Sequence, residues 1–387
     1  MLFTVPPLSR EELIVIQKVE GIRASLKYSL GTPVQRWSGF LRRTTLARAI
    51  RGSNSIEGYN VTKDDAMAVV EGEEPYEAAK DAWHAVVGYR NAMTYVLQLA
   101  NDPHFSYNDG LIRSLHYMML QYDLSKHPGR WRPGPIFIRD EQKNEIVYEG
   151  PDAELVPSLV RKLIESLNAA DGTPVIVRAA MAHLNLTMIH PFSDGNGRMA
   201  RCLQTLVMAR DGILEPQFCS IEEYLGRNTQ AYYDVLAEVG KGSWHPENDA
   251  RQWIRFCLTS HYRQASTLLR RTKETHRVWE ELELEVKKRG LPERVILALA
   301  DAAFGYRVRN STYRSVAEIS ENMASRDLKD LVDAGLLMAS GERRGRYYQS
   351  SPILLSIRHR ARESKVPEGV DPFVEVAATE QAELPFK

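Results

Sequence analysis

The stretch HPFSDGNGRMAR, residues 190–201, joins two segments whose apolar residues recur at helical spacing. In the segment before it, this spacing is formed by Val177, Met181, Leu184 and Met188. In the segment after it, the pattern i, i+3, i+4, i+7, i+8 is formed by Met199, Cys202, Leu203, Leu206 and Val207. The stretch is therefore predicted to be a loop between two helices, with most of its polar chemistry where the second helix begins.

The start of that second helix has the residue types of a phosphate site. Gly195, Asn196 and Gly197 leave backbone N–H groups free at a helix N-terminus, where small residues let a phosphate approach and the helix dipole favours negative charge. Arg198 and Arg201 lie three residues apart, so both guanidinium groups can face one ligand. A phosphate-bearing substrate is predicted to bind here.

Two further side chains of the loop fit the chemistry of such a substrate. Asp194 offers the carboxylate oxygen that Mg2+ prefers when it bridges phosphates. His190 has an imidazole that titrates near neutral pH, which suits a general base acting on an attacking hydroxyl. Taken singly, a histidine at a helix end is more often a cap, and Gly-Asn-Gly is more often a turn. In this order and between these helices, a phosphate site is the favoured interpretation.

The stretch resembles the signature of the Fic family, H-x-F-x-(D/E)-G-N-G-R-x-x-R, at every fixed position. The resemblance implies a mainly α-helical bundle that transfers AMP from ATP, with Mg2+, to a hydroxyl side chain of a protein and releases pyrophosphate. In the branch of the family that acts as a kinase, a lysine stands at the position of Gly197. The glycine here favours adenylyl transfer.

The same resemblance implies a role for each residue of the signature. His190 is the expected base, Asp194 the expected Mg2+ ligand, and Arg201 the expected partner of the γ-phosphate. The α- and β-phosphates are expected to lie against Gly195, Asn196, Gly197 and Arg198. Such a site works mainly by positioning its substrates and by electrostatic stabilisation.

A second motif precedes the signature, in RGSNSIEGYNVT at residues 51–62. Ser53 and Glu57 lie four residues apart and Gly58 follows, which by itself is typical of a helix C-terminus with a solvated glutamate. Beside the signature, this stretch resembles the family's inhibitory motif, (S/T)-x-x-x-E-(G/N). The resemblance implies that Glu57 pairs with Arg201, takes the space of the γ-phosphate and keeps the wild-type protein nearly inactive.

Residues 136–148 are predicted to form a β-hairpin ahead of the signature. Alternating or β-branched residues at 136–139 and 145–148 flank the polar run 140–144. The Fic family has a hairpin here, the flap, which holds the target protein as an added strand and presents its hydroxyl to the histidine. The stretch 148–151 lacks the paired prolines that usually follow the flap, and a plain surface hairpin is the alternative.

Tyr232 and Tyr233 lie on a predicted helix after the signature. Adjacent tyrosines on a helix are more often packing residues than a platform for a ligand. The family uses aromatic residues at the matching positions to line the adenine pocket, so both are candidate contacts to ATP. The sequence does not distinguish ATP from another nucleoside triphosphate.

The chain is long enough for two or three domains. We expect an N-terminal helical region at 1–110 with the inhibitory motif at 53–58, a Fic core at 111–249, a helical connector at 250–290, a C-terminal domain at 291–352 and a disordered tail at 363–387. Within the C-terminal domain, helices are predicted at 295–304, 315–322 and 323–335, and strands at 336–340 and 346–349. This order resembles a winged helix-turn-helix domain, a common C-terminal addition in the family.

The charges of that domain do not single out DNA as its partner. On its third predicted helix, two basic residues are outnumbered by three acidic ones: Arg326 and Lys329 against Asp327, Asp330 and Asp333. The predicted hairpin is the basic part, with Arg343, Arg344 and Arg346. DNA binding through the third helix stays open, and protein docking or a dimer contact is at least as well supported.

The composition is that of an ordinary globular chain, 43% hydrophobic and 26% charged. Because 50 basic residues balance 50 acidic ones, no overall field attracts nucleic acid or an anionic membrane. The widely spaced Cys202, Cys219 and Cys257 predict buried thiols in a reducing compartment. Residues 1–13 do not have the pattern of a signal peptide and no apolar run reaches membrane-spanning length, so a cytoplasmic protein is expected.

The sequence as a whole favours a protein adenylyltransferase, inhibited by Glu57, that modifies a serine, threonine or tyrosine hydroxyl of a protein, itself included. Two alternatives stay open: an enzyme that removes AMP, alone or as a second activity, and a nucleotide-sensing regulator that binds DNA. The target protein, the signal that releases Glu57 and a possible homodimer are not determined by the sequence.

Overall fold

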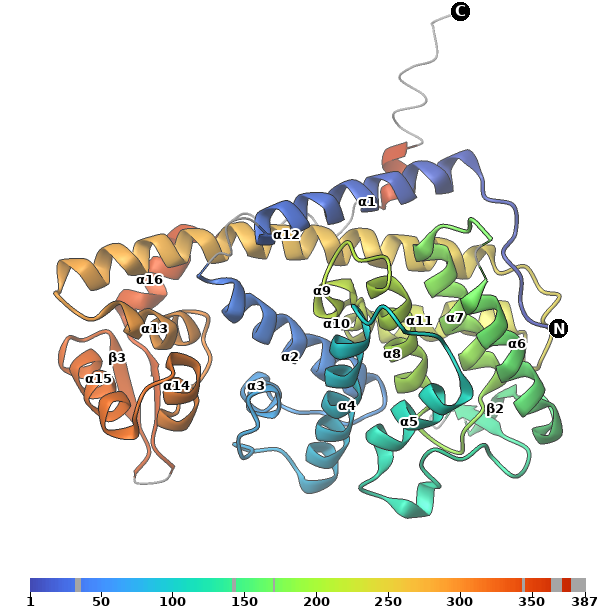
Figure 1. Cartoon of the computed structure of the whole chain (residues 1–387), viewed down its shortest axis with the longest axis horizontal. Helices are drawn as coiled ribbons and strands as arrows, with labels where there is room; N and C mark the ends of the chain where they lie inside the picture. The colour runs from blue at the N-terminus through green and yellow to red at the C-terminus, as the bar shows by residue number, and fades with distance from the viewer. Residues whose placement is uncertain (32–35, 141–143, 170, 343–344, 363–370, 377–387) are drawn as a thin grey trace, which may run out of the picture.

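The computed structural model describes residues 1–31, 36–140, 144–169, 171–342, 345–362 and 371–376. Its fold is mainly α-helical, as predicted, with two small two-stranded sheets in the described part of the chain. Figure 1 shows a large helical bundle and a smaller C-terminal unit, with one long helix running along both.

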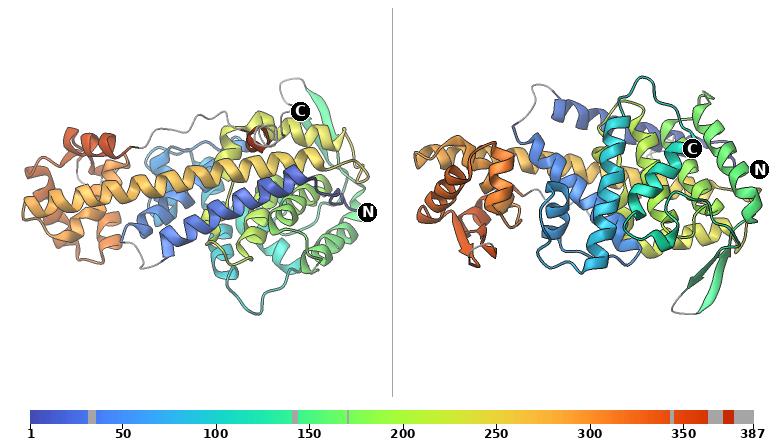
Figure 2. Two further views of the ribbon diagram at one scale, coloured as in Figure 1. Left: turned by 90° about the horizontal axis from the view of Figure 1, so that it is seen from above. Right: turned by 60° about the horizontal axis from the view of Figure 1, so that its bottom comes forward.

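The long helix, α12, spans Arg251–Lys288, within the range predicted as a helical connector. Its 38 residues correspond to a length of about 57 Å. The N-terminal helix α1, Arg10–Gly31, lies alongside it in both views of the ribbon (Figures 1 and 2). These two helices form the backbone to which the other elements attach.

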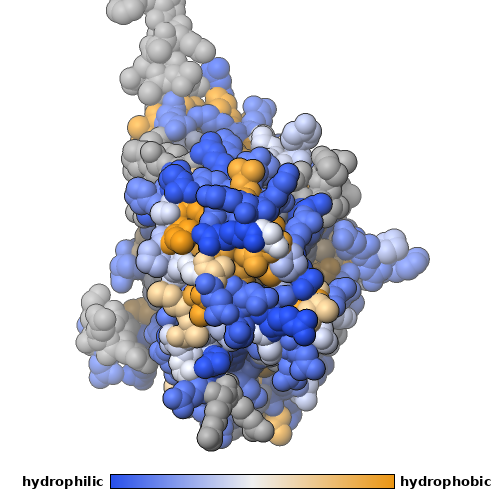
Figure 3. Space-filling view, turned by 90° about the vertical axis from the view of Figure 1, so that its left-hand side faces the viewer, coloured by the Kyte–Doolittle hydropathy of each residue, from blue (hydrophilic) through white to orange (hydrophobic). Residues whose placement is uncertain are grey.

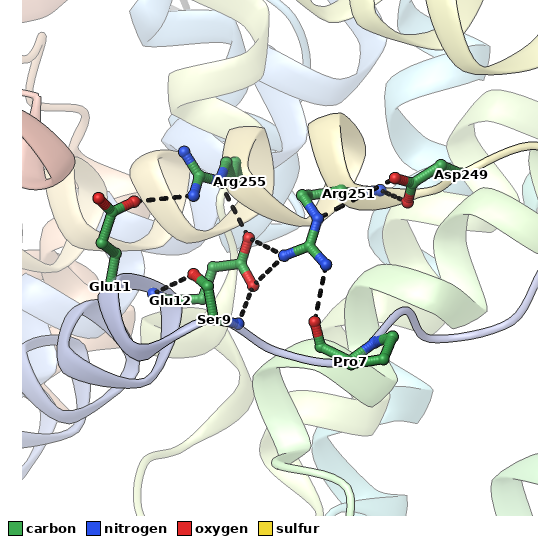
Figure 4. Close-up of polar contacts among 7 residues, drawn as sticks. All are labelled: Pro7, Ser9, Glu11, Glu12, Asp249, Arg251 and Arg255. Atoms are coloured by element: carbon green, nitrogen blue, oxygen red, sulfur yellow. Dashed lines mark hydrogen bonds and ion pairs between the residues drawn. The ribbon is translucent and has the colours of Figure 1, made fainter.

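The start of α1 is held to the start of α12 by a buried carboxylate (Figure 4). Ser9 and Glu12 form a capping box, in which the Ser9 N–H donates to Glu12 Oε2 at 2.7 Å and the Glu12 N–H donates to Ser9 Oγ at 3.3 Å. Arg251 and Arg255 both donate to the Glu12 carboxylate, at 2.8–2.9 Å. Burial opposes the charge, but these hydrogen bonds outweigh it and lower the pKa of Glu12.

The bundle is built from ten helices of the described residues: α2 Ser38–Ile56, α3 Lys63–Glu71, α4 Lys80–Leu99, α5 Asp109–Leu120, α6 Val156–Asn168, α7 Val175–Ile189, α8 Asn196–Ala209, α9 Pro216–Cys219, α10 Glu222–Arg227 and α11 Thr229–Gly240. Short 3-10 turns lie at Leu124–Lys126 and Ala153–Leu155. Helices α7 and α8 are buried at nearly every position, so the loop between them sits on the centre of the core. All three cysteines are buried thiols, as predicted.

Helix α2, whose last turn carries the second sequence motif, crosses α10 at very short range. A Cβ added at Gly52 would lie 2.4 Å from the backbone oxygen of Glu222, and one added at Gly226 would lie 2.7 Å from the oxygen of Gly52. Two glycines therefore allow the two backbones to touch. This contact fixes where the C-terminal turn of α2 ends.

The predicted hairpin is present as β1, Phe137–Asp140, and β2, Glu145–Glu149. The strands pair antiparallel, with an irregularity between Ile138 and Arg139. The hairpin projects from the bundle (Figure 2). The tip of the hairpin, residues 141–143, lies outside the described residues.

The C-terminal unit contains the 3-10 turn Glu293–Val295 (η3), α13 Ile296–Ala303, α14 Asn310–Ala317, α15 Glu321–Asp333, β3 Leu337–Ser340, β4 Tyr347–Ser350 and α16 Pro352–Ala361. The second helix was predicted too late, at 315–322. Glu318 takes a left-handed conformation that ends α14, and the Ser320 side chain accepts from the Met323 N–H as the N-cap of α15. Three helices and a hairpin are the parts of a winged helix, and assignment to that class stays a prediction.

The tail predicted as disordered is helical in part. Residues 372–376 form a short helical turn in which Val376 is buried, and Glu375 accepts from Lys18 of α1 at 3.1 Å. The prediction of disorder is therefore wrong for this turn. Its side chains pack against α1 and α12, and this packing stabilises the helical conformation. Residues 363–370 and 377–387 lie outside the described part. Within the described residues, no helix is both long and apolar enough to cross a membrane.

Candidate active site

The loop between α7 and α8 is held in one shape by backbone conformation and by a side-chain clamp. His190 and Gly195 both take left-handed conformations, with φ of 51° and 75°. The positive φ of Gly195 favours glycine there, and an added Cβ would also approach Leu120 Cδ1 to 2.9 Å. The buried Asn196 side chain accepts from the Phe192 N–H at 2.9 Å and donates to the Phe192 oxygen at 2.8 Å. Its amide therefore shapes the loop from within.

His116 of α5 holds the loop through a hydrogen bond and a ring contact. Its Nδ1 accepts from the Gly129 N–H at 2.8 Å, so the proton is on Nε2, which donates to the Asp194 oxygen at 2.9 Å. The ring stacks on Phe192 with centroids 3.6 Å apart. Burial lowers the pKa of His116 to about 4, which keeps this neutral tautomer in place. The sequence gives a weak signal for this role, a histidine on the apolar face of a helix.

His190 is poised to accept a proton. Its Nδ1 lies 3.1 Å from the Thr187 oxygen, which can only accept, so Nδ1 carries the hydrogen and Nε2 has a free lone pair. Burial lowers the pKa of His190 to about 4. The side chain is therefore a neutral imidazole at neutral pH, as a general base requires.

Arg132 ties the histidine to the base of the hairpin. Its Nε donates to the His190 oxygen at 2.9 Å, and its other nitrogens donate to the oxygens of Gly134 and Pro151. Tyr148 of β2 adds a hydrogen bond to the Met188 oxygen at 2.8 Å. The hairpin and the loop are thus one connected structure. Sequence reasoning missed Arg132, because a lone arginine between Trp131 and Pro133 carries no motif.

Arg198 is a buried cation without a hydrogen-bonded partner among the described residues. Its relative exposure is 0%, and none of its three guanidinium nitrogens makes a hydrogen bond there. The Tyr59 ring lies against it, with its centroid 5.1 Å from Arg198 Cζ. A buried charge left unpaired is costly. Beside it lie the first N–H groups of α8, which have no partner within the helix and no side-chain cap at Gly195.

Asp194 faces the same region with its carboxylate charged. Oδ1 accepts from the Gly195 N–H at 2.6 Å, and Oδ2 lies 2.7 Å from Lys126 Nζ. Burial opposes the charge, but Lys126 and Arg198 outweigh it and lower the pKa of Asp194. One carboxylate beside a phosphate site fits Mg2+, which completes its shell with phosphate and water. Lys126, for which the sequence offered no signal, holds that carboxylate here.

Arg201 is hydrogen-bonded to two residues of the second sequence motif, Ser53 and Glu57. Its Nε donates to Ser53 Oγ at 2.8 Å, and its Nη2 donates to the Ser53 oxygen at 3.0 Å and to Glu57 Oε1 at 2.7 Å. Burial opposes the charge, but Glu57 outweighs it and raises the pKa of Arg201. The Glu57 carboxylate also lies over Gly197, where an added Cβ would approach its Oε1 to 2.4 Å. In the structure Glu57 and Arg201 are therefore in contact, as the resemblance implied.

The two candidate tyrosines of α11 differ in their surroundings. Tyr232 is buried, and its hydroxyl lies 2.9 Å from His183 Nε2 within the core. Tyr233 is 44% exposed, and its hydroxyl donates to the Ile56 oxygen at 3.1 Å, at the end of α2. Tyr233 therefore has a free face for a ligand, whereas Tyr232 packs behind it with ring centroids 5.4 Å apart.

Comparisons with known proteins agree with this geometry. Residues 107–208 match the model of the Fic/DOC family. A protein adenylyltransferase Fic from Nematostella vectensis is 28% identical over 214 residues, 53% of this chain and 44% of that protein. Protein adenylyltransferase fic-1 from Caenorhabditis elegans is 23% identical over 66% of this chain and 50% of that protein. The chain thus spans half or less of the length of these distant relatives.

Solved structures show the same fold at low sequence identity. A Fic family protein from Desulfovibrio desulfuricans G20 aligns over 90% of this chain and 99% of its own, with a TM-score of 0.59 and 20% identity. Fic-1 from Caenorhabditis elegans aligns over 67% of this chain and 72% of its own, with a TM-score of 0.52 and 21% identity. The loop, its surroundings and these matches identify residues 107–208 of the chain as a domain of the Fic/DOC family.

Proposed function

We propose that this chain is a protein adenylyltransferase that uses ATP and Mg2+. The oxygen of a target hydroxyl attacks the α-phosphorus of ATP, the bond to pyrophosphate breaks, and His190 Nε2 takes the hydroxyl proton. The names of the distant relatives support this activity. A hydroxyl of the chain itself is a second acceptor, by the same chemistry.

The observation that carries the proposal is the buried Arg198 guanidinium, which has no hydrogen-bonded partner among the described residues. Arginine binds phosphate through paired, charge-assisted hydrogen bonds. The free N–H groups at the start of α8 are available on the same side of the loop. The nucleotide phosphates would satisfy both, while the exposed face of Tyr233 would lie against the base.

The metal requirement follows from the donor set around Asp194. Its carboxylate would hold Mg2+ next to the phosphates, and bound there the ion would offset the negative charge that develops on them. Lys126 would release Asp194 when the ion binds.

We further propose that Glu57 inhibits the enzyme. Its carboxylate engages Arg201 and covers Gly197, the two places where the γ-phosphate would bind. With Glu57 present, a triphosphate meets a like charge, and Arg201 cannot turn to it. Release of Glu57 would open the site.

The hairpin β1–β2 is the proposed contact for the target protein. The outer edge of β1 is free of strand pairing in the described residues, and Phe137 and Ile146 expose about half of their side chains. An extended target segment can pair with such an edge. Arg132 would then set the distance between that segment and His190.

Removal of AMP is a second candidate, favoured by the position of Glu57. Its charge acts on His190, and its side chain is 25% exposed, so it can hold a water near the histidine. A purified target already carrying labelled AMP distinguishes the two reactions. Loss of label with wild type but not with Glu57→Ala would favour removal, and retention of label with both would exclude it.

The C-terminal unit is a proposed docking module for a protein. Its third helix α15 exposes Arg326 and Lys329 beside Glu321, Asp330 and Asp333, a mixed surface that does not suit the phosphate backbone of DNA. The end face of the molecule formed by this unit is largely hydrophilic, with small apolar groups between the polar ones (Figure 3). A salt-dependent shift of duplex DNA by the full chain would contradict this assignment.

The test of the proposed function uses α-labelled ATP and Mg2+ with the full chain. We expect little label on wild type, strong label on Glu57→Gly, and intermediate label on Glu57→Gln, which keeps the side-chain shape and loses the charge. Adding His190→Ala to Glu57→Gly should abolish the label. Adding His104→Ala, an exposed histidine far from the loop in sequence, should leave it unchanged. Equal labelling of wild type and Glu57→Gly would remove the inhibitory role.

A further inference from the structure

A cavity of about 260 Å³ lies where the helical bundle meets the C-terminal unit. Its walls come from α2, α12 and α16, with Arg227 of α10 and Phe304 at the end of α13. Figure 1 shows α13 and α16 beside the C-terminal half of α12. Six lining residues are arginines: Arg48, Arg227, Arg270, Arg271, Arg358 and Arg362. We call this cavity the arginine pocket. None of residues 190–201 lines it.

The arginine pocket has more positive charge than its carboxylates offset. Glu223 accepts from Arg271 at 2.6 and 2.8 Å and pairs with Arg227 at 2.5 Å. Glu274 accepts from Arg358 at 2.7 Å and lies 3.6 Å from Arg270. Two carboxylates therefore face six arginines, which leaves an excess of four positive charges in a small volume.

Two of the arginines have no ion pair or side-chain hydrogen bond with the described part of the chain: Arg48 of α2 and Arg362 after α16. Burial lowers the pKa of Arg48, and Arg271 beside it adds repulsion. Burial and the charge of Arg48 both lower the pKa of Arg358. Arg227 and Arg362 are exposed, but the other four arginines are partly shielded from water, where like charges repel each other more strongly than in water. Binding of an anion in the pocket would relieve this repulsion.

A buried hydroxyl provides a second, independent observation. Thr275 of α12 lines the arginine pocket, is only 2% exposed, and its Oγ1 makes no hydrogen bond with the described residues. A threonine within a helix usually bonds the carbonyl one turn back when no other acceptor exists. Here the hydroxyl is free to donate to a ligand oxygen.

We propose that the arginine pocket binds a compact anion carrying two or more phosphate groups. Guanidinium groups match phosphate oxygens in pairs, and a ligand with several charges on few atoms is needed to offset this excess in such a small space. The volume is just below the range of about 300–1,000 Å³ typical of ligand pockets, which excludes a large ligand. This site is separate from the nucleotide site at Arg198 and does not depend on the proposed function.

Such a ligand would join three separate segments of the chain. It would contact Arg48 of α2, Thr275 of α12 and Arg362 beyond α16 at once. A ligand that binds only the folded chain stabilises it in proportion to the logarithm of its concentration. Thermal stability is therefore a readout that requires no catalysis.

The experiment is calorimetric titration of the full chain with pyrophosphate in EDTA, with the melting temperature followed in parallel. We expect wild type to bind pyrophosphate and inorganic phosphate to bind at least tenfold more weakly. Arg48→Gln should weaken pyrophosphate binding at least tenfold, and the nearly isosteric Thr275→Val several-fold. Arg161→Gln, an exposed arginine of α6, is the matched control and should bind as wild type.

A variant of the nucleotide site separates the two anion sites. Arg198→Gln should keep the pocket's affinity for pyrophosphate and its thermal shift. Loss of all binding in Arg198→Gln would overturn the proposal, because the anion would then belong to the nucleotide site. The proposal also fails if Arg48→Gln and Thr275→Val titrate like wild type, or if wild type does not bind pyrophosphate. Because Arg48 and Thr275 Oγ1 bond no described residue, both variants should fold.

Discussion

His190 is a base because of two neighbours rather than its own ordinary pKa. The Thr187 oxygen fixes the hydrogen on Nδ1, and burial lowers the pKa to about 4. An exposed histidine would lose half of its basic form near pH 6.5. The site therefore keeps its base neutral at pH values where an ordinary histidine is already charged.

This difference gives a pH profile for the Glu57→Gly variant. A group whose pKa is lowered loses its basic form only as pH falls towards that lowered value. Labelling should therefore stay constant from pH 8 to about pH 6 and fall only at lower pH. Initial rates of self-labelling, with folding checked by circular dichroism at each pH, measure this. A decline centred near pH 6.5 would contradict the role of burial.

Lys126 competes with Mg2+ for Asp194. The pair is partly exposed, with side-chain exposures of 25% and 37%, so it contributes about 0.5–1 kcal/mol. Lys126→Met in the Glu57→Gly background should lower the Mg2+ concentration for half-maximal labelling roughly two- to fivefold. The measurement is a Mg2+ titration of the labelling rate. A higher Mg2+ requirement would indicate instead that Lys126 binds the nucleotide.

Helix α2 is the element that connects the packing of the bundle with the inhibitory turn. Its Gly52 touches the backbone of α10, and the next residue, Ser53, holds Arg201. The backbones of α2 and α10 are in direct contact, so neither helix can shift locally at this point. The position of Glu57 therefore depends on this crossing. A contact between backbones leaves no trace in the pattern of apolar residues.

Substitution of two glycines on α2 tests the crossing. A Cβ at Gly52 would lie 2.4 Å from the Glu222 oxygen, and Gly52→Ala should cost about 1–3 kcal/mol of stability through overpacking. Gly39→Ala in the first turn of the same helix meets no atom within 4 Å and should change stability by less than about 0.5 kcal/mol. Denaturant midpoints followed by circular dichroism compare them. Similar stability of both variants would disprove the tight crossing.

At the scale of the whole molecule, the core contains a chain of hydrogen bonds that includes two buried histidines. The Tyr232 hydroxyl donates to His183 Nε2, His183 Nδ1 donates to Gln204 Oε1, and Gln204 Nε2 donates to His261 Nε2. Protonation of His261 would set its Nε2–H against the Gln204 amide N–H, a donor against a donor. Burial lowers the pKa of both histidines to about 3.

The folded chain should therefore lose stability in mild acid. Below about pH 6.5 the unfolded state binds protons on these histidines and the folded state does not, so stability falls as pH falls. At pH 5 the loss is about 2 kcal/mol for each ring. Melting temperatures at pH 7 and pH 5 measure it. His261→Gln should show a smaller drop than wild type, and the exposed control His104→Gln the full drop. An equal drop in all three would contradict the linkage.

Much of the site could be predicted from the sequence because its parts are local. Residues 190–201 are contiguous, and Ser53 and Glu57 are one helical turn apart, so their types and order indicate the chemistry. The supporting residues are not local. His116, Lys126 and Arg132 reach the loop from other elements and belong to no motif. Tyr232 and Tyr233 look alike in the sequence, and only packing makes one a core residue and leaves the other partly exposed.

By itself the sequence determined the mainly helical class, the loop between two helices, the hairpin and the long connector, because hydrophobic period and local motifs encode them. It misplaced α14 and the helical turn at 372–376, where a single cap or a docking surface decides. Only the tertiary structure decided which residues support the loop, which cation is left unpaired, and where six arginines meet. These depend on distances between segments far apart in the chain, which no local pattern contains.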